Sequence, residues 1–213
     1  MTRGMTLADA AREFWRHPSP WLLAIAFLGA FVARVVVGDW QWSDAVLPVA
    51  VLAVFPFVEW MIHVFVLHWR PRRIAGVMID PLLGRKHRAH HADPKIVKLI
   101  FIPLESLAGA FGAALLTAFV IIPRTGLGLT FLVVVFGVGV VYEWSHYLVH
   151  TDYKPKTWFY RTIYKNHRLH HFKNEHYWFA VTTPGIADRA LGTYPDPQSV
   201  PTSPTAKNLF SLT

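Results

Sequence analysis

Four long apolar segments dominate the chain and limit what it can fold into. They run from Trp21 to Val37, from about Ala45 to Trp69, from about Leu99 to Ile122 and from Leu127 to about His150. A helix rises about 1.5 Å per residue, so each segment crosses or nearly crosses a hydrocarbon core of about 30 Å. Hydrophobic residues make up 53% of the chain and charged residues 16%, which excludes an ordinary soluble domain. We therefore predict an all-α integral membrane protein with four transmembrane helices.

The basic residues predict the orientation of these helices. Four spans place both termini and the loop 70–98 on one side of the membrane, and 19 of the 21 Lys and Arg residues lie on that side. Only Arg34 and Arg124 lie elsewhere. The positive-inside rule makes that side cytoplasmic. Nucleic-acid binding is disfavoured because no recognition motif accompanies the charges, whereas anionic membrane lipids or an acidic redox partner fit them.

The length of 213 residues predicts one membrane domain over 1–213. Residues 1–19 form an amphipathic lead-in, 21–150 hold the four spans with the cytosolic loop 70–98, and 151–213 form a cytosolic cap and tail. The end of the chain is rich in Pro, Ser and Thr, so we expect it to be extended over the surface. The lead-in has charges of both signs and no small-residue cleavage site follows, so we do not expect a removed signal peptide.

Ten of the twelve histidines fall into two matching sets. Each set has a pair of histidines at the end of an apolar segment, then a basic linker, then an HxxHH motif. Residues three or four apart in a helix share a face, so we expect the histidines of each HxxHH motif to point together. The first set is His63, His68, His87, His90 and His91, and the second is His146, His150, His167, His170 and His171.

This pattern indicates metal binding. Imidazole binds Fe, Zn, Cu and Ni well, and the chain has no cysteine, so a metal must rest on nitrogen and oxygen ligands. Ionisable groups at membrane depth are costly and point to function. Ten imidazoles exceed the needs of one ion, so we predict two ions and no catalytic residue beyond their ligands. His63 and His68 are five residues apart, about 140° around an α-helix, which predicts that they serve different metals.

Three further residues are candidates for the surroundings of the metals. Glu59 and Glu143 precede the first histidine of each set by four and three residues, which places them on the histidine face. They are expected to orient imidazole N–H groups or, alternatively, to neutralise Arg34 or a basic loop residue. His176 lies outside the two sets and is a candidate ligand or a neighbour of one, whereas His17 is expected to be structural.

Taken together, the motifs HxxxxH, HxxHH, HxxxH and HxxHH resemble those of the fatty acid hydroxylase superfamily, across about Glu59 to Trp178. These membrane di-iron enzymes include fatty acid 2-hydroxylases, sterol desaturases and carotenoid hydroxylases, and the segment from Leu67 to Pro71 is similar to the first of these branches. The resemblance implies four transmembrane helices under a cytosolic helical cap, with the ten histidines binding two Fe ions. Zinc could replace iron in purified protein.

The same resemblance implies an oxidoreductase that uses O₂ to hydroxylate an unactivated C–H bond of a lipid, most simply a fatty acyl chain. It also implies electrons from a separate donor, such as ferredoxin or cytochrome b5 with its reductase. Hydroxylation or desaturation of a sterol or carotenoid is an alternative within the superfamily. Outside the superfamily, the alternatives are a bis-histidine haem electron-transfer protein, a metal transporter and an intramembrane zinc protease. The lack of an HExxH motif disfavours the protease. Gly109, Gly112, Gly137 and Gly139 leave room for an acyl chain or permit close helix packing.

Overall fold

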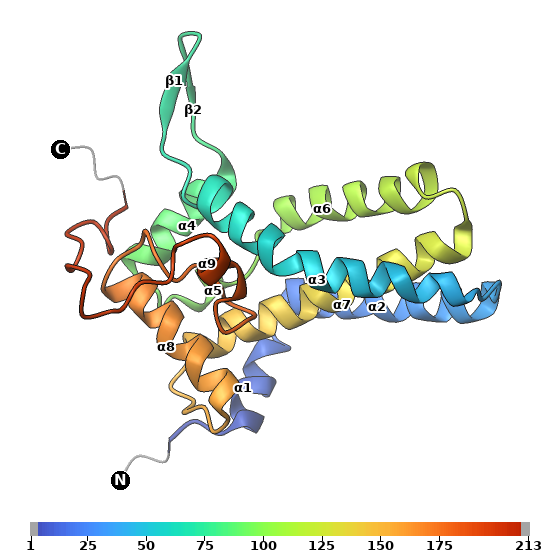
Figure 1. Cartoon of the computed structure of the whole chain (residues 1–213), viewed down its shortest axis with the longest axis horizontal. Helices are drawn as coiled ribbons and strands as arrows, with labels where there is room; N and C mark the ends of the chain where they lie inside the picture. Colours follow the sequence, from blue (N-terminus) through green and yellow to red (C-terminus); the bar gives the residue numbers. More distant parts are fainter. Residues whose placement is uncertain (1–3, 210–213) are drawn as a thin grey trace. The chain divides into compact units, whose positions relative to one another are not determined.

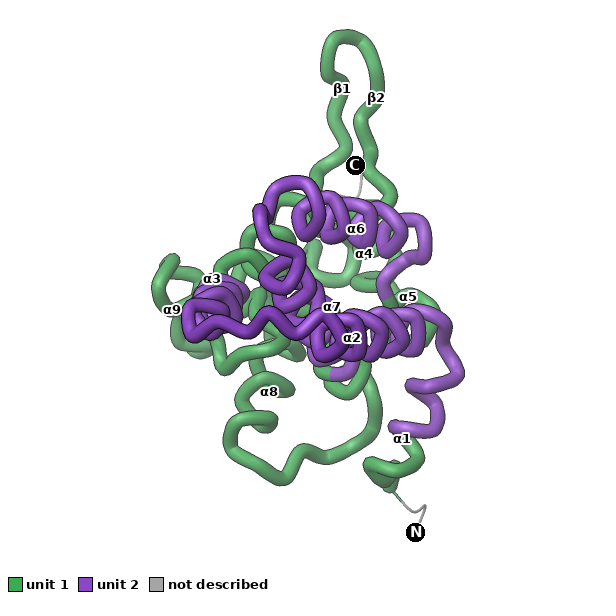
Figure 2. The backbone as a smooth tube through the Cα atoms, turned by 90° about the vertical axis from the view of Figure 1, so that its right-hand side faces the viewer, with its two compact units in different colours: residues 1–10, 56–101, 145–213 green, residues 11–55, 102–144 purple. Residues whose placement is uncertain are grey.

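The computed structural model describes residues 4–209, and the described chain is mostly helical (Figure 1). It forms two compact units, which are coloured separately in Figure 2. Among the described residues, unit 1 comprises 4–10, 56–101 and 145–209, and unit 2 comprises 11–55 and 102–144.

Four helical segments are long and apolar enough to cross a membrane: Pro18–Val37, Trp42–Leu67, Val97–Ile121 and Thr125–Val149. Their ends agree with the predicted spans to within a few residues. The first begins earlier than expected because Pro18 lies in its first turn, where a missing N–H costs nothing. By the length and composition of these four helical segments, the chain is thus a multi-pass membrane protein.

Two of these segments contain more than one type of helix. The others are the single helices α2 (Pro18–Val37) and α7 (Thr125–Val149). The second segment consists of η1 (Trp42–Ala45), α3 (Val46–Met61) and η2 (Ile62–Leu67), and the third of α5 (Val97–Ile100), α6 (Leu104–Leu116) and η3 (Thr117–Ile121). Both η2 and η3 are π-helices, a wide form in which residue i bonds to i+5 and which is frequent at functional sites.

Unit 2 has an apolar core between α2, α6 and α7. Its buried residues include Leu23, Leu107 and Phe136. A Cβ on Gly139 would lie 2.9 Å from the Leu23 side chain, and one on Gly137 would lie 3.2 Å from a Phe27 ring atom. Close helix packing therefore explains these two glycines, as a small residue lets two backbones approach.

A buried ion pair closes one end of unit 2. The Arg34 guanidinium donates to Asp44 Oδ2 at 2.8 Å, and both side chains are buried. Arg124 also donates to the Asp44 carboxylate. The partner of Arg34 in this ion pair is therefore Asp44, and not one of the two glutamates considered for that role.

Within unit 1, the predicted loop 70–98 contains a β-hairpin and a helix. Strands β1 (Arg72–Ile74) and β2 (Val77–Ile79) form an antiparallel hairpin, in which Ala75 and Gly76 have φ of 49° and 81°. Two residues with positive φ are what a two-residue hairpin turn requires, but alanine seldom adopts this conformation, so the turn has no clear signature in the sequence. The helix is α4 (Leu82–Ala92).

Among residues 4–209, three further helices lie outside the four spans and the loop 70–98. They are α1 (Leu7–Phe14), α8 (Trp158–Phe172) and α9 (Ile186–Ala190). From Gly192 to Leu209 the described chain has no helix or strand, which agrees with the expected extended tail. This tail packs against the rest of unit 1, because the Ser203 N–H donates to the Lys173 carbonyl at 2.7 Å and Ala206 is buried.

Candidate metal centre

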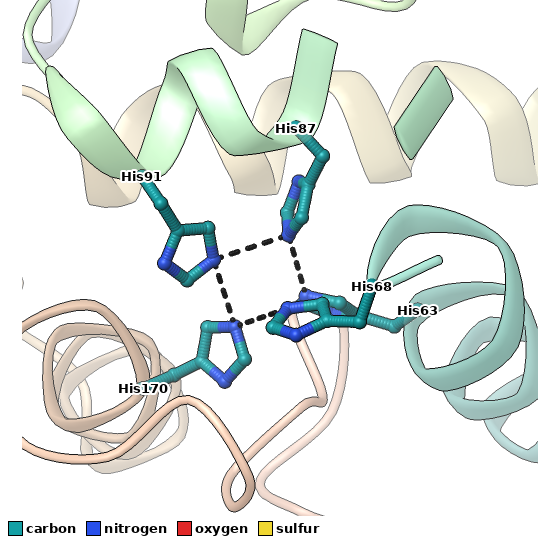
Figure 3. A group of neighbouring side chains, drawn as sticks. All are labelled: His63, His68, His87, His91 and His170. Atoms are coloured by element: carbon teal, nitrogen blue, oxygen red, sulfur yellow. Dashed lines mark hydrogen bonds between the residues drawn. The ribbon is translucent and has the colours of Figure 1, made fainter. Parts of the chain in front are cut away.

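Nine of the ten candidate histidines gather in two groups within unit 1. In each group, one ring nitrogen per residue lies within 4.8 Å of those of all the other members. The first histidine group, drawn in Figure 3, is His63, His68, His87, His91 and His170. The second histidine group is His90, His146, His150 and His167.

Each HxxHH motif is divided between the two groups. Helix α4 contributes His87 and His91 to the first group and His90 to the second, and α8 contributes His170 to the first and His167 to the second. Successive residues of an α-helix are about 100° apart and residues three apart are about 60° apart, so the three histidines of one motif project in different directions. The expectation that all histidines of one motif point together was therefore wrong, and one helix supplies both groups.

His63 and His68 lie in the same group, contrary to the expectation that they face different metals. The reason is η2, in which the His68 N–H donates to the His63 carbonyl at 3.0 Å. This i to i+5 hydrogen bond of a π-helix brings residues five apart to the same side. The 140° angle of an α-helix does not apply here.

Backbone carbonyls fix the protonation of four imidazoles. A carbonyl oxygen can only accept, so an Nδ1 bonded to one carries the proton and leaves Nε2 with a bare lone pair. The Nδ1 donors and carbonyl acceptors are His63 to Phe179 at 2.7 Å, His91 to Ala206 at 2.8 Å, His146 to Ile100 at 2.8 Å and His170 to Tyr177 at 2.9 Å.

The Nε2 atoms of His91 and His170 then face each other at 3.2 Å with no proton between them (Figure 3). Two lone pairs at this distance repel unless a cation lies between them. Ligand nitrogens about 2.1 Å from one ion, at tetrahedral or octahedral angles, are about 3.0–3.4 Å apart. The Nε2 pairs in the second group, at 3.0 Å for His90 and His150 and 2.8 Å for His150 and His167, are close to this range. The donor set therefore fits metal ions.

Burial favours the neutral form of the imidazoles that α4 and α8 contribute. Burial lowers the pKa of His91 to about 4, although its hydrogen bond to the Ala206 carbonyl raises it. Burial, with repulsion from His63, lowers the pKa of His170 well below its ordinary value. Neutral imidazole is the form that binds a metal, so little proton release would accompany metal binding here.

One histidine of the two sets, His171, and the further candidate His176 lie outside the groups. His171 is close to the second, since its Nε2 is 3.0 Å from that of His167, and its ring stacks on His91 with a centroid distance of 4.1 Å. His176 has an exposed side chain whose Nε2 lies 3.7 Å from Glu175 Oε1, and the structure brings it to neither group.

Glu59 and Glu143 bond to the backbone and, among the described residues, to no imidazole. Glu59 Oε1 accepts the N–H groups of Val181 and Thr182 at 2.9 and 3.0 Å. Glu143 Oε1 accepts the Ile102 N–H at 3.0 Å. The structure therefore does not show these carboxylates orienting the imidazoles directly. Glu59 thus holds residues 181 and 182 of the chain that follows the last histidine motif.

A family model for fatty acid hydroxylases matches residues 48–193, which include every candidate histidine of the two sets. The chain belongs to the fatty acid hydroxylase family. It is 26% identical over 190 residues to the dihydroceramide fatty acyl 2-hydroxylase of Arabidopsis thaliana, covering 85% of this chain and 73% of that protein. No solved structure matches the chain.

Asp188 is a residue near the histidines that the sequence did not reveal. It is fully buried, and its carboxylate accepts the N–H groups of Phe179 and Ala180, both at 2.9 Å, and the Thr193 hydroxyl at 2.7 Å. Phe179 is the residue whose carbonyl orients His63. Asp188 lies after the last histidine motif and belongs to no recognisable sequence motif itself, so the sequence gives no signal for it.

Glu175 is a second residue missed in this way. Its Oε1 accepts the hydroxyls of Ser203 and Thr205, which anchors the tail whose Ala206 carbonyl orients His91. Burial, the largest influence, raises the pKa of Glu175, but these hydrogen bonds and one from its own backbone together lower it below the usual value. The carboxylate is therefore ionised when it holds the tail.

Proposed function

We propose that this protein is an O₂-dependent di-iron monooxygenase that hydroxylates an unactivated C–H bond in a fatty acyl chain of a lipid. The family match supports a fatty acid hydroxylase. The relative from Arabidopsis, which by its name acts on the fatty acyl chain of dihydroceramide, supports an acyl substrate.

The contact between His91 and His170 carries this proposal. Both imidazoles have their Nδ1 proton committed to a carbonyl, so their Nε2 lone pairs converge at 3.2 Å. A hydrogen-bonded histidine cluster would place a proton between such atoms. A bis-histidine haem is disfavoured, because the ring centroids of neighbouring imidazoles are only 4.9 Å apart here and leave no space for a macrocycle.

The two groups support an assignment of the ligands. We propose that the first histidine group holds one ion, and that the second group together with His171 holds the other. Each ion would then have five imidazoles available. Neutral imidazoles suit iron as well as zinc, so zinc in purified protein would be compatible with iron in the cell.

When bound, the two ions supply the oxidising chemistry, in which a C–H group, O₂, two electrons and two protons give C–OH and water. The residues of the chain hold and shield the site. The carbonyls of Phe179 and Tyr177 keep a proton on Nδ1 of their histidines and leave Nε2 free. The Phe179 ring, itself buried, lies 5.2 Å from the ring of His170 and excludes water from the first group.

We further propose that residues 1–213 work as one membrane domain with both termini and the histidines on the cytoplasmic side. The support is the position of 19 of the 21 basic residues on that side of the four predicted spans. A separate donor, such as ferredoxin or cytochrome b5 with its reductase, would then reach the site from the cytoplasm.

Metal analysis with lipid profiling tests the proposal. Protein is purified anaerobically from iron-supplemented cells, and lipids are compared between cells that express the native chain and cells that express His91→Ala/His170→Ala. We expect about two irons per native chain, in line with two groups of ligands, and a lipid that has gained one oxygen only with the native chain. A gain of unsaturation would make the protein a desaturase. Haem, or no metal, would overturn the proposal.

A further inference from the structure

One face of α8 carries exposed positive charge. Arg161, Lys165 and Arg168 are three or four residues apart, so they share a face of the helix, and Trp158 and Phe172 extend the same face at its two ends. All five side chains are exposed. We call these five residues the α8 stripe.

The charge of the α8 stripe is not neutralised by the chain itself. Between Asp152 and Glu175 the sequence has six Lys and Arg residues and no acidic residue. Within residues 4–209, no ion pair involves the three basic residues of the stripe. The Arg168 guanidinium instead lies over the Phe172 ring, 5.2 Å from its centroid. Such a face attracts a negatively charged surface.

We infer that the α8 stripe is the docking surface for an acidic one-electron carrier protein. The inference rests on the proposed function, because monooxygenation consumes two electrons per turnover. Two successive encounters would each oxidise one reduced carrier and pass one electron to the metal centre. With O₂, two protons and the C–H group, these two electrons give C–OH and one water.

The position of the stripe on its helix fits this role. The opposite face of α8 carries His167 and His170, which belong to the two histidine groups, and His171. An α-helix with its side chains is about 10–12 Å across. A carrier on the outer face would therefore lie about one helix diameter from the imidazoles, without any part of the chain having to move.

A protein fits the stripe better than a lipid surface does. A helix that lies on a membrane needs an apolar face to immerse, but the face of α8 opposite the stripe is buried and holds histidines and Ile163. Aromatic residues and arginine are enriched at protein interfaces. The stripe spans the 15 residues of α8, which is about 20 Å and suits the small interfaces of redox encounters.

The test measures reduction of the metal centre rather than product. Full-length, iron-loaded protein in phosphatidylcholine nanodiscs is mixed anaerobically with a reduced plant-type [2Fe–2S] ferredoxin, and oxidation of the ferredoxin is followed by stopped-flow absorbance. The stripe variant is Arg161→Glu/Lys165→Glu/Arg168→Glu. The control variant, Arg72→Glu/Arg73→Glu/Lys95→Glu, makes the same change of charge at exposed residues outside α8. Dithionite serves as a small reductant that needs no docking surface.

At low salt we expect the stripe variant to lose at least about tenfold in the second-order rate with ferredoxin, and the difference to shrink as salt rises. The control variant should stay within about twofold of the native chain, since surface charges far from an encounter site have little effect. All three proteins should bind iron and be reduced by dithionite equally. Equal rates with ferredoxin would overturn the docking surface and leave the proposed function intact.

Two other results would also overturn the inference. If dithionite fails to reduce the iron-loaded native chain, the proposed function fails and the inference fails with it. The experiment is repeated in nanodiscs that contain phosphatidylglycerol. If reduction of the stripe variant by dithionite is also slowed, and only in these nanodiscs, the stripe contacts anionic lipid headgroups instead of a carrier.

Discussion

The two histidine groups use the same kinds of motif but are supported differently by the chain. In the first group, three imidazoles donate Nδ1–H to a backbone carbonyl, whereas in the second only His146 does. The Nδ1 atoms of His90 and His167 are buried and have no partner within the described part of the chain. Similar sequence motifs therefore give two sites that differ in how firmly their ligands are oriented.

The difference comes from segments that contain no histidine motif. Residues 177–182 and the tail supply the carbonyls for the first group, and Asp188, Glu59 and Glu175 hold those segments in place. Groups that orient a metal ligand affect affinity by about 10–100-fold. We expect the first group to bind its ion more tightly than the second, and four predictions test this comparison.

Loss of a ligand from either group should have the largest effect. His170→Ala and His146→Ala should each lower hydroxylation by more than about 100-fold, beyond the loss typical of an outer partner. Each should also reduce the metal content, measured by mass spectrometry, by about one ion per chain. His17→Ala is the control and should change neither. Full activity in the two ligand variants would show that these histidines do not bind the metals.

Asp188→Ala should affect the first group alone. The N–H groups of Phe179 and Ala180 would lose their acceptor, and each buried unsatisfied group costs about 1–3 kcal/mol of stability. The affinity of the first group for its ion should fall by about 10–100-fold as His63 loses its orientation. Metal titration of the variant measures this, with the exposed Asp152→Ala as control. Equal weakening of both groups would argue against a local effect.

Removal of metal should proceed in two steps. A chelator added to the fully loaded protein should remove the ion of the second group before that of the first group. The rates of removal, or the affinities, of the two groups should differ by about tenfold. Metal content followed over time should show two phases, and in His146→Ala only the slow phase should remain. A single phase for both ions would remove the distinction between the groups.

Glu175→Ala should have the smallest effect. It releases the hydroxyls of Ser203 and Thr205, but the Ser203 N–H still bonds to the Lys173 carbonyl. We expect the first group to weaken by less than about tenfold, because only His91 is affected. Glu175→Gln keeps an acceptor oxygen and should lie nearer the native chain. A larger loss than that of Asp188→Ala would mean that the tail, rather than residues 177–182, is the main support of the first group.

Much of this structure follows from periodicity and composition. The four spans and the two HxxHH helices were predicted because long apolar segments and i, i+4 spacing depend on local geometry alone. The hairpin around Ala75 was missed because its turn lacks the usual residues. The division of His90 from His91 needed only the 100° step of the helix, but the roles of Asp188 and the tail depend on contacts between segments far apart in sequence.

The π-helix η2 also bears on how this family can vary in sequence. His63 and His68, at the end of η2, have four residues between them and lie in the first group. His146 and His150, at the end of α7, have three residues between them and lie in the second group. The wider turn of the π-helix thus accommodates one more residue between two histidines that still lie in the same group. Insertion or deletion of a single residue between two metal ligands, which ordinarily would be expected to destroy a site, can here be neutral when the helix type changes with it.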